Sequence, residues 1–422
     1  MVPESLHSAQ GRDDWIESQD RKRRLRVLFI TEFLPWPLNT GGRIRTYHIL
    51  RQVALRHEVT LVTQKPPGGP EAEEQIRALV SQLYSVPLKP RSFIRKTLAA
   101  TAFLASARPY VAVYSHYREV LARLISRLTG RESFDIVHLD HLDAAVYLPN
   151  CSPKAAVYLD EHNYETSLLR STRDKTSQSL LRWYLGSQLR KLARFERETL
   201  RAVDAVSVVS AQEAHMVAAV APHTDQAVIP NGVDPAFFDI SRHPRPYRVV
   251  SVGSLDWLPN VEGLRWFLDE VWPSVLEARP DATFHMVGRN PQRALLRQVC
   301  RGVSVAGSVA DIREHVRDAA AFVVPLLAGG GTRLRVLEAM AMRVPIVSTR
   351  VGVEGIECTH GQHVLVADAA EDFAHQLIAL LDRGELRESL AMEGRQLVER
   401  RYSWQAIGDG LDAFYRRIVG RA

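Results

Sequence analysis

Short runs of apolar and β-branched residues alternate along the chain with longer stretches in which apolar residues recur at helical spacing. The alternation starts at residue 26 and is typical of parallel sheets whose strands are joined by helices. It occurs in two separate blocks. We therefore expect an α/β protein with two doubly wound, Rossmann-like domains that face a cleft, with ligands bound at the carboxyl ends of the strands.

The two blocks can be divided into elements. In the first block we predict strands at 26–31, 58–63, 135–140, 155–160 and 205–210, helices at 43–56, 71–83, 113–129 and 165–202, and a last strand and turn at 228–234. In the second block we predict strands at 249–254, 282–288, 304–307, 321–326 and 345–349, and helices at 260–278, 332–342 and 370–383. Two further helical segments follow, broken near Tyr402–Trp404.

A polar, proline-bearing stretch at 241–248 separates the blocks and is typical of a linker. The sequence thus predicts a polar tail at 1–25, a first domain at 26–240, a second domain at 246–400 and a final helical segment at 401–422. The tail lacks the apolar core of a secretory signal, and no run is long enough to span a bilayer. We expect a cytoplasmic protein, with a peripheral position on the inner face of the membrane as the alternative.

Composition narrows the class further. A chain of 422 residues with 46% hydrophobic and 24% charged side chains can bury substantial cores, which excludes a disordered protein. The three cysteines, Cys151, Cys300 and Cys358, include no CxxC pair, which argues against a disulfide framework or a cysteine zinc site and favours a reducing compartment. The net charge of +6 suits a polyanionic partner or an anionic membrane surface without identifying either.

The loop after the first predicted strand ends in Gly41 and Gly42, directly before a helix that begins near Arg43. A helix N-terminus at this place can receive an anion or a sugar hydroxyl, although a simple tight turn is the alternative. A dinucleotide fingerprint would need GxGxxG immediately after the strand, and here a long proline-containing loop intervenes. A nicotinamide dehydrogenase is therefore disfavoured.

The stretch GGGTRLRVLEAMAMRVP at 329–345 places charged residues in a helix that reads as buried. Arg335 and Glu338, at i,i+3, can pair with each other, and that is one explanation of their presence. The other is a ligand: the glycines, with Thr332 as N-cap, offer backbone N–H groups to phosphate, and arginine adds a charged fork. The Glu338 carboxylate can accept hydrogen bonds from vicinal hydroxyls. Together these groups suit a nucleoside diphosphate.

With these motifs the chain resembles the family 4 retaining glycosyltransferases of the GT-B fold. The resemblance rests on GGR at 41–43, LDEHNYE at 159–165, VIPNGVD at 228–234, VGSLDWLPN at 252–260, VGRNP at 287–291 and GGGTRLRVLEAMAMRVPIVST at 329–349. It covers nearly the whole chain after residue 26 and is closest to the subgroup that assembles cell-surface or exported polysaccharide. It implies an acceptor-binding first domain, a second domain that binds the nucleotide sugar, and a final segment that returns to the first domain.

The resemblance also assigns roles to residues. Glu338 becomes the second glutamate of an E-x7-E pair and binds the ribose hydroxyls, whereas Gly330 stands in place of the first glutamate. The donor sugar must then be met by backbone groups or by another side chain. His162, at a strand end beside Asp160 and Glu161, would face the sugar. The transfer would be metal-independent and need no cofactor, so basic groups and helix dipoles would stabilise the leaving diphosphate.

Related enzymes commonly place an arginine and a lysine in the loop after the first strand of the nucleotide domain, but here that loop has no basic residue. We therefore predict that Arg335 is the main phosphate clamp, with Arg289 as a second. The expected catalytic residues are His162, Glu338 and Arg335, and the expected substrate-binding residues are Gly41, Gly42, Arg43, Ser254, Asp256, Asn260, Arg289, Gly330, Gly331, Thr332, Arg333 and Leu334. By helical projection Arg333 falls among Val336 and Met340.

Two other features allow a choice of interpretation. His138 and His141 form an HxxH pair, which we do not interpret as a zinc site because no third ligand follows at suitable spacing. Between Arg91 and Arg131 there are eight basic residues and one acidic residue, interleaved with aromatic ones. This segment fits a patch over anionic lipid or a solvated helical face over core aromatics. Nucleic acid is disfavoured, because no binding module accompanies the segment.

The main functional hypothesis is a glycosyltransferase that moves a sugar from a nucleoside diphosphate donor to a lipid-linked or saccharide acceptor. The missing first glutamate motivates a second hypothesis, a non-catalytic subunit that only binds the nucleotide sugar. A sugar-nucleotide epimerase of the GT-B fold is a third, and it would need no acceptor.

Overall fold

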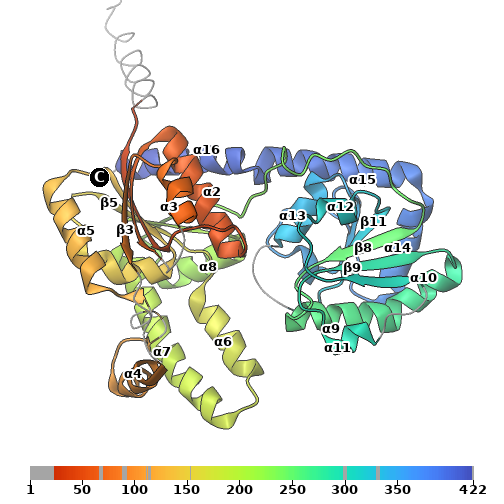
Figure 1. Cartoon of the computed structure of the whole chain (residues 1–422), viewed down its shortest axis with the longest axis horizontal. Helices are drawn as coiled ribbons and strands as arrows, with labels where there is room; N and C mark the ends of the chain where they lie inside the picture. The colour runs from red at the N-terminus through yellow and green to blue at the C-terminus, as the bar shows by residue number, and fades with distance from the viewer. Residues whose placement is uncertain are drawn as a thin grey trace, which may run out of the picture. The chain divides into compact units, whose positions relative to one another are not determined.

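The computed structural model describes residues 23–65, 70–87, 93–110, 112, 116–152, 154–297, 302–328 and 333–420. They divide into two compact units (Figure 1). The first unit contains the described residues up to Val208, Glu213–Ile229 and the chain from Gly408 onward; the second contains Val209–Gln212 and Pro230–Ile407. No helix in the described part of the chain combines the length and the apolar character needed to cross a membrane.

The first unit is built on a parallel sheet of seven strands in the order β3-β2-β1-β4-β5-β6-β7. The strands are β1 Arg26–Phe33, β2 Glu58–Lys65, β3 Gln82–Pro87, β4 Ile136–Asp140, β5 Ala156–Asp160, β6 Ala205–Val208 and β7 Asp225–Val228. Every residue of β4, β5 and β6 is buried, which explains why these strands read as apolar runs rather than as alternating patterns. The strand order reverses between β1 and β4.

Helices cover both faces of this sheet, as the crossover connections of parallel strands require. The helical elements of this unit are α2 Gly41–Arg56, α3 Pro70–Arg77, α4 Phe93–Ala105, α5 Glu119–Arg131, the 3-10 helix η2 Leu142–Asn150, α6 Glu165–Lys175, α7 Ser179–Ala202 and α8 Ala211–Val220. Of these, α4 lies beside α7 and not on the sheet (Figure 1). Helices α6 and α7 form an antiparallel pair that extends beyond the sheet (Figure 1).

The second unit contains a parallel sheet of six strands in the order β10-β9-β8-β11-β12-β13. The strands are β8 Arg248–Val252, β9 Thr283–Val287, β10 Val303–Ala306, β11 Ala321–Val324, β12 Ile346–Ser348 and β13 Leu365–Val366. The helical elements are α9 Leu258–Trp266, η3 Phe267–Val271, α10 Trp272–Ala278, α11 Arg293–Leu296, α12 Arg313–Val316, α13 Leu334–Ala341, η4 Val351–Val353, α14 Ala370–Asp382, α15 Gly384–Leu397 and η5 Val398–Tyr402. Separate apolar clusters lie on the two faces of the sheet.

The final helix, α16 Trp404–Val419, contributes to the core of the first unit from Gly408 onward. Tyr415 is fully buried there, and its hydroxyl hydrogen-bonds to Nδ1 of His138. Asp412 lies 3.0 Å from Nε2 of His57, and Arg417 pairs with Asp225 at 2.8 Å. These contacts fix the end of the chain to the first sheet.

Some predicted boundaries were wrong. The helix predicted at 71–83 ends at Arg77, and its last residues form β3, which pairs with β2. The helix predicted at 113–129 begins at Glu119. The helix predicted at 165–202 is two helices, because the polar stretch 176–178 breaks it. The last strand, predicted together with its turn at 228–234, is β7 at Asp225–Val228, so it begins three residues earlier and ends before Pro230, which has no N–H to pair.

The boundary between the units also differs from the one expected after residue 240. Pro230–Ile240 belongs to the second unit, where Val233 forms a bridge with Ser403 and the Asp239 carboxylate pairs with Arg343 at 2.6 Å. These contacts involve residues distant in sequence. The linker composition at 241–248 therefore marks the turn into β8 and not the change of unit.

Candidate functional site

Each sheet has one place where neighbouring strands connect in opposite directions, and parallel sheets bind ligands at the carboxyl ends of such strands. In the second unit this place lies between β8 and β11. The loop after β8 leads into α9, and the loop after β11 leads into α13. A Cβ at Gly263 of α9 would lie 2.1 Å from the carbonyl oxygen of Pro325, so the two connections pack directly against each other.

Helix α13 carries the glutamate and the arginine that the sequence analysis singled out. The Glu338 side chain is 12% exposed, and its Oε2 accepts a hydrogen bond from Nη1 of Arg335 at 2.5 Å. Burial raises the pKa of Glu338, and the Arg335 charge opposes that rise. The Arg335 side chain is 47% exposed. The i,i+3 pair is thus present, and it leaves part of the guanidinium open to solvent.

Arg333 occupies a different environment from the one projected. Helix α13 begins at Leu334, and Arg333 holds the N-cap position in a non-helical conformation, so the cap predicted at Thr332 was wrong. The buried Arg333 side chain donates from Nε to the carbonyl of Val351 at 3.3 Å, and its Nη2 lies 3.9 Å from Glu354. Burial lowers the pKa of Arg333 against the attraction of Glu354. Gly330, Gly331 and Thr332 lie outside the described residues.

The loop after β8 forms a hydrogen-bonded group with the loop after β9. Arg289 donates from Nε to Oγ of Ser254 at 2.8 Å, and Asn260 donates from Nδ2 to the Ser254 carbonyl at 2.9 Å. Asn290 donates to the Asp256 carboxylate at 2.8 Å. The structure therefore brings together four predicted ligand residues, Ser254, Asp256, Asn260 and Arg289, and exposed Arg289 supplies the positive charge that the β8 loop lacks.

The close approach of these two loops depends on glycine. A Cβ at Gly288 would lie 1.6 Å from the carbonyl oxygen of Gly253, and a Cβ at Gly253 would lie 2.7 Å from Nδ2 of Asn260. Neither position has room for a side chain. The glycines of VGS and VGR thus hold Arg289 beside Ser254.

A cavity of about 600 Å³ lies at the carboxyl ends of β11 and β12. Its wall includes Leu326 after β11, Thr349 after β12, and the turn 350–356. Val351 and Glu354 of this turn are the residues that Arg333 faces. The volume is in the range of small-molecule sites, and the cavity adjoins the beginning of α13.

In the first unit the strand register aligns polar residues at the carboxyl ends of the central strands. Asp140 of β4 is paired with Asp160 of β5, and Asp160 with Ser207 of β6. Asp140 accepts hydrogen bonds from Thr31 at 2.6 Å and from Thr46 at 2.9 Å. This row of groups forms the floor beneath His162.

His162 is held by two carboxylates. Its Nε2 lies 3.0 Å from Asp140 and 3.5 Å from Asp160, and its side chain is 10% exposed. Burial acts to lower the pKa of His162, but the two carboxylates outweigh it, so the pKa is raised. Nδ1 has no hydrogen-bond partner among the described residues. A protonated His162 can therefore offer its Nδ1–H to a ligand while Nε2 stays bound to the floor.

Arg45 is the partner that sequence reasoning missed. Its guanidinium donates two hydrogen bonds to Asp160, at 2.6 Å and 3.1 Å, and both side chains are buried. Ser207 donates a third at 2.6 Å. Burial acts to raise the pKa of Asp160, but the charges of Arg45 and His162 outweigh it. The pKa of Asp160 therefore lies well below its usual range. The sequence could have indicated Arg45 by its position, because Arg45 lies one turn before Ile49 on the buried face of α2.

A chain of alternating carboxylates and imidazoles was also missed. It runs from Glu32 to His116 at 2.6 Å, to Asp143 at 3.4 Å, to His141 at 3.1 Å and to Glu165 at 3.0 Å. Burial acts to lower the pKa of both histidines, but their carboxylate partners raise it above the usual value. His116 lies far from the other members in sequence, so no motif connects them.

The HxxH pair does not converge on one point. His138 lies within β4, is fully buried, and stacks on Phe29 with ring centroids 3.9 Å apart. His141 follows the strand with a positive φ of 75° and contacts Asp143 and Glu165 instead. Elsewhere in the described chain, oxygen and nitrogen atoms of Glu32, His116 and Asp143 that could bind a metal lie within 4.8 Å of one another. The two ring nitrogens of His116 face the carboxylates of Glu32 and Asp143.

Helix α2 begins at Gly41, two residues before the predicted start. Thr40 is the N-cap and accepts from the Arg43 amide at 3.4 Å, while Arg43 donates to Asn39 at 3.2 Å. A Cβ at Gly42 would meet no atom within 4 Å. The first turn of α2 is therefore accessible, and close packing does not require a glycine at position 42.

Comparison with known proteins agrees with this architecture. The family model "Glycosyltransferase Family 4" matches residues 40–237, and "Glycosyl transferases group 1" matches 246–383. A Klebsiella pneumoniae protein described as an uncharacterized 44.6 kDa protein in the cps region is 25% identical over 38% of this chain and 43% of its own length. A Corynebacterium glutamicum GDP-mannose-dependent mannosyltransferase, which acts on a phosphatidylinositol monomannoside, is 29% identical over 34% of this chain and 41% of its own. The chain thus spans about two fifths of the length of these curated relatives.

Solved structures extend the likeness to the whole fold. Sucrose-phosphate synthase from Thermosynechococcus elongatus aligns with a TM-score of 0.66 at 16% identity, covering 94% of this chain and 100% of that one. Anabaena HepE in complex with UDP-glucose aligns with a TM-score of 0.62 at 14% identity, covering 93% and 99%. WaaG, a glycosyltransferase involved in lipopolysaccharide biosynthesis, aligns at 0.59 and 16%, covering 92% and 99%. By its two family matches and its pair of parallel-sheet units, the chain belongs to the family 4 glycosyltransferases of the GT-B fold.

Proposed function

We propose that the protein is a retaining hexosyltransferase that moves a sugar from a nucleoside diphosphate sugar to a lipid-linked or saccharide acceptor in cell-surface polysaccharide or glycoconjugate synthesis. The observation that carries the proposal is the start of α13. There a nearly buried carboxylate, Glu338, lies beside the half-exposed Arg335. The N-cap of the same helix, Arg333, contacts two residues that line a cavity of about 600 Å³. The cps-region relative and the likeness to WaaG support the biosynthetic context.

The second unit supplies the donor site in this proposal. The Glu338 carboxylate has two acceptor oxygens and accepts a hydrogen bond from each of the two ribose hydroxyls. Arg335 and Arg289 neutralise the diphosphate, assisted by the N-terminal end of α13. During transfer the bond between the anomeric carbon and the diphosphate oxygen breaks, and negative charge accumulates on the diphosphate. These positive groups stabilise that charge and so lower the barrier.

The first unit supplies the acceptor side. Its protonated His162 donates from Nδ1 to a hydroxyl of the transferred sugar, and Asp140 and Asp160 keep the imidazolium in place. The acceptor hydroxyl forms the new bond to the anomeric carbon on the face that the diphosphate leaves, and its proton passes to the departing phosphate oxygen. His162 therefore acts mainly in the transition state, when the charge of the sugar ring changes.

Two other activities predict different behaviour. A subunit that only binds the nucleotide sugar would be stabilised by the donor but would release no nucleoside diphosphate. A sugar-nucleotide epimerase would convert the donor without an acceptor. The environment of His162 favours catalysis over simple binding. Its carboxylate partners raise its pKa, its Nδ1 has no partner among the described residues, and both properties suit a reacting centre.

The first test of the donor site is thermal stabilisation. The melting temperature is measured with UDP, GDP and their sugar conjugates at millimolar concentration, where specific binding stabilises the folded state. We expect one base to raise the melting temperature clearly more than the other. If neither nucleotide changes it, the proposed donor site is contradicted.

We predict that Arg335→Met weakens a nucleoside diphosphate more than the bare nucleoside. The lost charge-assisted contact is worth about 1.5 to 3 kcal/mol and exists only where phosphate is present. Titration of both ligands measures the difference, with Arg265→Met, an exposed arginine on α9, as the matched control. Equal losses for both ligands, together with a lower melting temperature, would show that Arg335 serves only to pair with Glu338.

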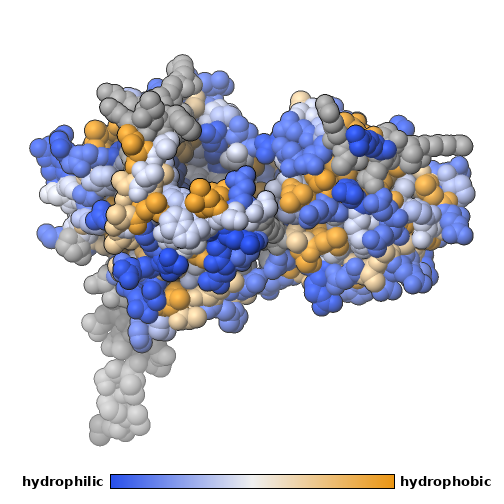
Figure 2. All heavy atoms as spheres, turned by 90° about the horizontal axis from the view of Figure 1, so that it is seen from below, coloured by the Kyte–Doolittle hydropathy of each residue, from blue (hydrophilic) through white to orange (hydrophobic). Residues whose placement is uncertain are grey.

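For the basic segment at 91–131 we propose an electrostatic contact with anionic lipid. Helix α5 buries its apolar face through Leu121, Ile125 and Leu128, whereas Arg123 and Arg127 are exposed, as is the apolar Val120 at its start. The surface in Figure 2 likewise carries apolar residues in small groups between hydrophilic ones. Neutralising Arg123 and Arg127 together should weaken binding to vesicles that contain phosphatidylserine and leave binding to neutral vesicles unchanged. Unaltered binding to the anionic vesicles contradicts the proposal.

A further inference from the structure

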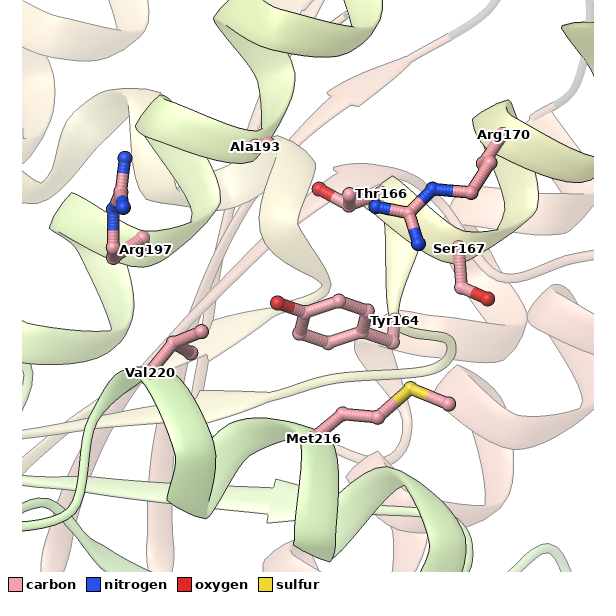
Figure 3. A pocket seen from close by; sticks show the side chains of 8 residues that line it. All are labelled: Tyr164, Thr166, Ser167, Arg170, Ala193, Arg197, Met216 and Val220. Atoms are coloured by element: carbon pink, nitrogen blue, oxygen red, sulfur yellow. The ribbon is translucent and has the colours of Figure 1, made fainter.

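A second cavity, of about 400 Å³, lies in the first unit away from the floor of His162. The loop after β5 and helices α6, α7 and α8 enclose it (Figure 3). Tyr164 comes from the loop, Arg170 from α6, Arg197 from α7, and Met216 and Val220 from α8. His162 precedes Tyr164 by two residues, so one loop carries both the candidate catalytic group and a wall of this cavity.

The two arginines of the cavity have no partner among the residues that the structure describes. Neither Arg170 nor Arg197 forms a hydrogen bond or an ion pair with any described residue. Both side chains are exposed, and Arg190 and Arg194 of α7 likewise form no such contact with the described residues. Arg173 of α6, by contrast, pairs with Asp174 at 2.6 Å. Two unpaired guanidinium groups that line one cavity favour an anionic ligand, because each offers a planar fork to carboxylate or phosphate oxygens.

A tyrosine hydroxyl lies between these charges. Figure 3 shows the Tyr164 ring in the centre of the cavity, with Arg170 and Arg197 on different sides of it. Burial raises the pKa of Tyr164 to about 12, Glu196 and Glu161 add to the rise, and the two arginines oppose it. The phenol is therefore protonated at neutral pH and can donate a hydrogen bond.

The carboxylates behind the loop do not neutralise the cavity. Glu196 accepts hydrogen bonds from the backbone amides of Glu165 at 2.7 Å and Thr166 at 3.1 Å, which caps α6. Burial raises the pKa of Glu196 to about 7 and that of Glu161 well above its usual value. Both groups are thus at least partly protonated near neutral pH. The positive charge of Arg170 and Arg197 remains available to a ligand.

We propose that this cavity binds the acidic group, a carboxylate or a phosphate, of an anionic acceptor sugar. The proposal rests on the transferase function, since it names the acceptor class of the first unit. Arg170 binds the acidic group, Arg197 adds positive charge on the other side of the cavity, and Tyr164 donates to a ring or hydroxyl oxygen. Met216, Val220 and Ala193 give an apolar wall for the C–H face of the sugar. A volume of about 400 Å³ suits a ligand of the size of a sugar unit.

The test measures binding of small sugars without any donor present. Wild-type protein is titrated by calorimetry with glucuronate, glucose 6-phosphate, methyl glucoside and inorganic phosphate. We expect the two acidic sugars to bind at least tenfold more tightly than the other two. The double variant Arg170→Gln/Arg197→Gln should lose at least tenfold in affinity for the acidic sugars, and Arg190→Gln, an exposed arginine on α7, should lose none.

Three results would overturn the proposal. They are equal binding of methyl glucoside, binding of inorganic phosphate as tight as that of glucose 6-phosphate, and unchanged affinity of the double variant. Melting curves with and without UDP and GDP are measured in parallel for every variant. Suppose that one of these three results is found while the double variant keeps its nucleotide response and transfers sugar to a neutral acceptor at the wild-type rate. The proposed site for acidic sugars is then contradicted, and the proposed transferase function is not.

Discussion

Replacing Arg45 with methionine is expected to lower the free energy of unfolding by about 3 to 5 kcal/mol, the usual cost of removing one partner from a buried ion pair. Asp160 is fully buried, and its ionised form depends on the two hydrogen bonds from Arg45. Methionine leaves that charge without its hydrogen-bonded guanidinium, so that only His162, at 3.5 Å, remains as a counter-ion. Urea denaturation of the wild type and the variant measures the loss.

The matched control is Arg51→Met, because Arg51 is exposed on the same helix. A surface substitution of this kind should change stability by no more than about 0.5 kcal/mol. The double variant Arg45→Met/Asp160→Asn should recover part of the loss, since it removes the unpaired charge. If Arg45→Met and Arg51→Met unfold at the same urea concentration, Asp160 is not held by the pair.

The second large effect concerns the transfer reaction. His162→Ala should lower the rate of transfer by about 10- to 100-fold, the loss expected when one charge-assisted hydrogen bond to the reacting sugar is removed. Nucleotide affinity should stay nearly unchanged, because His162 belongs to the first unit and Glu338 and Arg335 to the second. Rates are compared with nucleotide dissociation constants from calorimetry. Parallel losses in nucleotide affinity and turnover would contradict this division of roles.

The pH dependence provides an internal check on the same residue. The pKa of His162 is raised above 6.5, so the imidazolium is fully formed below that value and is lost as the pH rises through the folded-state pKa. The wild-type transfer rate should therefore decline as the pH rises above 6.5 through the folded-state pKa, and that decline should be absent in the residual rate of His162→Ala. A variant that keeps the decline would assign it to another group.

The elements that the sequence predicted well are those in which local pattern and burial agree. Strands such as β4 and β5 are buried along their whole length, so their apolar runs were unambiguous. Strand β3 has intermediate burial at four of its six positions, and no such pattern separated it from the preceding helix. The break between α6 and α7 depends on three polar residues inside a long helical pattern.

The site was predictable to the extent that its residues lie in one motif. Glu338 and Arg335 share a helix, and His162 lies at the end of a strand. Arg45 and His116 were missed because their partners lie 115 and 84 positions away along the chain, so only tertiary structure brings them together. A buried arginine on an apolar helix face was nevertheless a usable signal for a hidden carboxylate.

The most direct test of the central claim is acceptor-dependent transfer by the wild-type protein. The purified protein is incubated with the stabilising sugar nucleotide, with and without a saccharide acceptor, and nucleoside diphosphate and glycoside are quantified by mass spectrometry. We predict one equivalent of glycoside for each nucleoside diphosphate that the acceptor causes to be released. A protein that is stabilised by the sugar nucleotide, yet forms neither product with any acceptor, would be a binding subunit and would contradict the account.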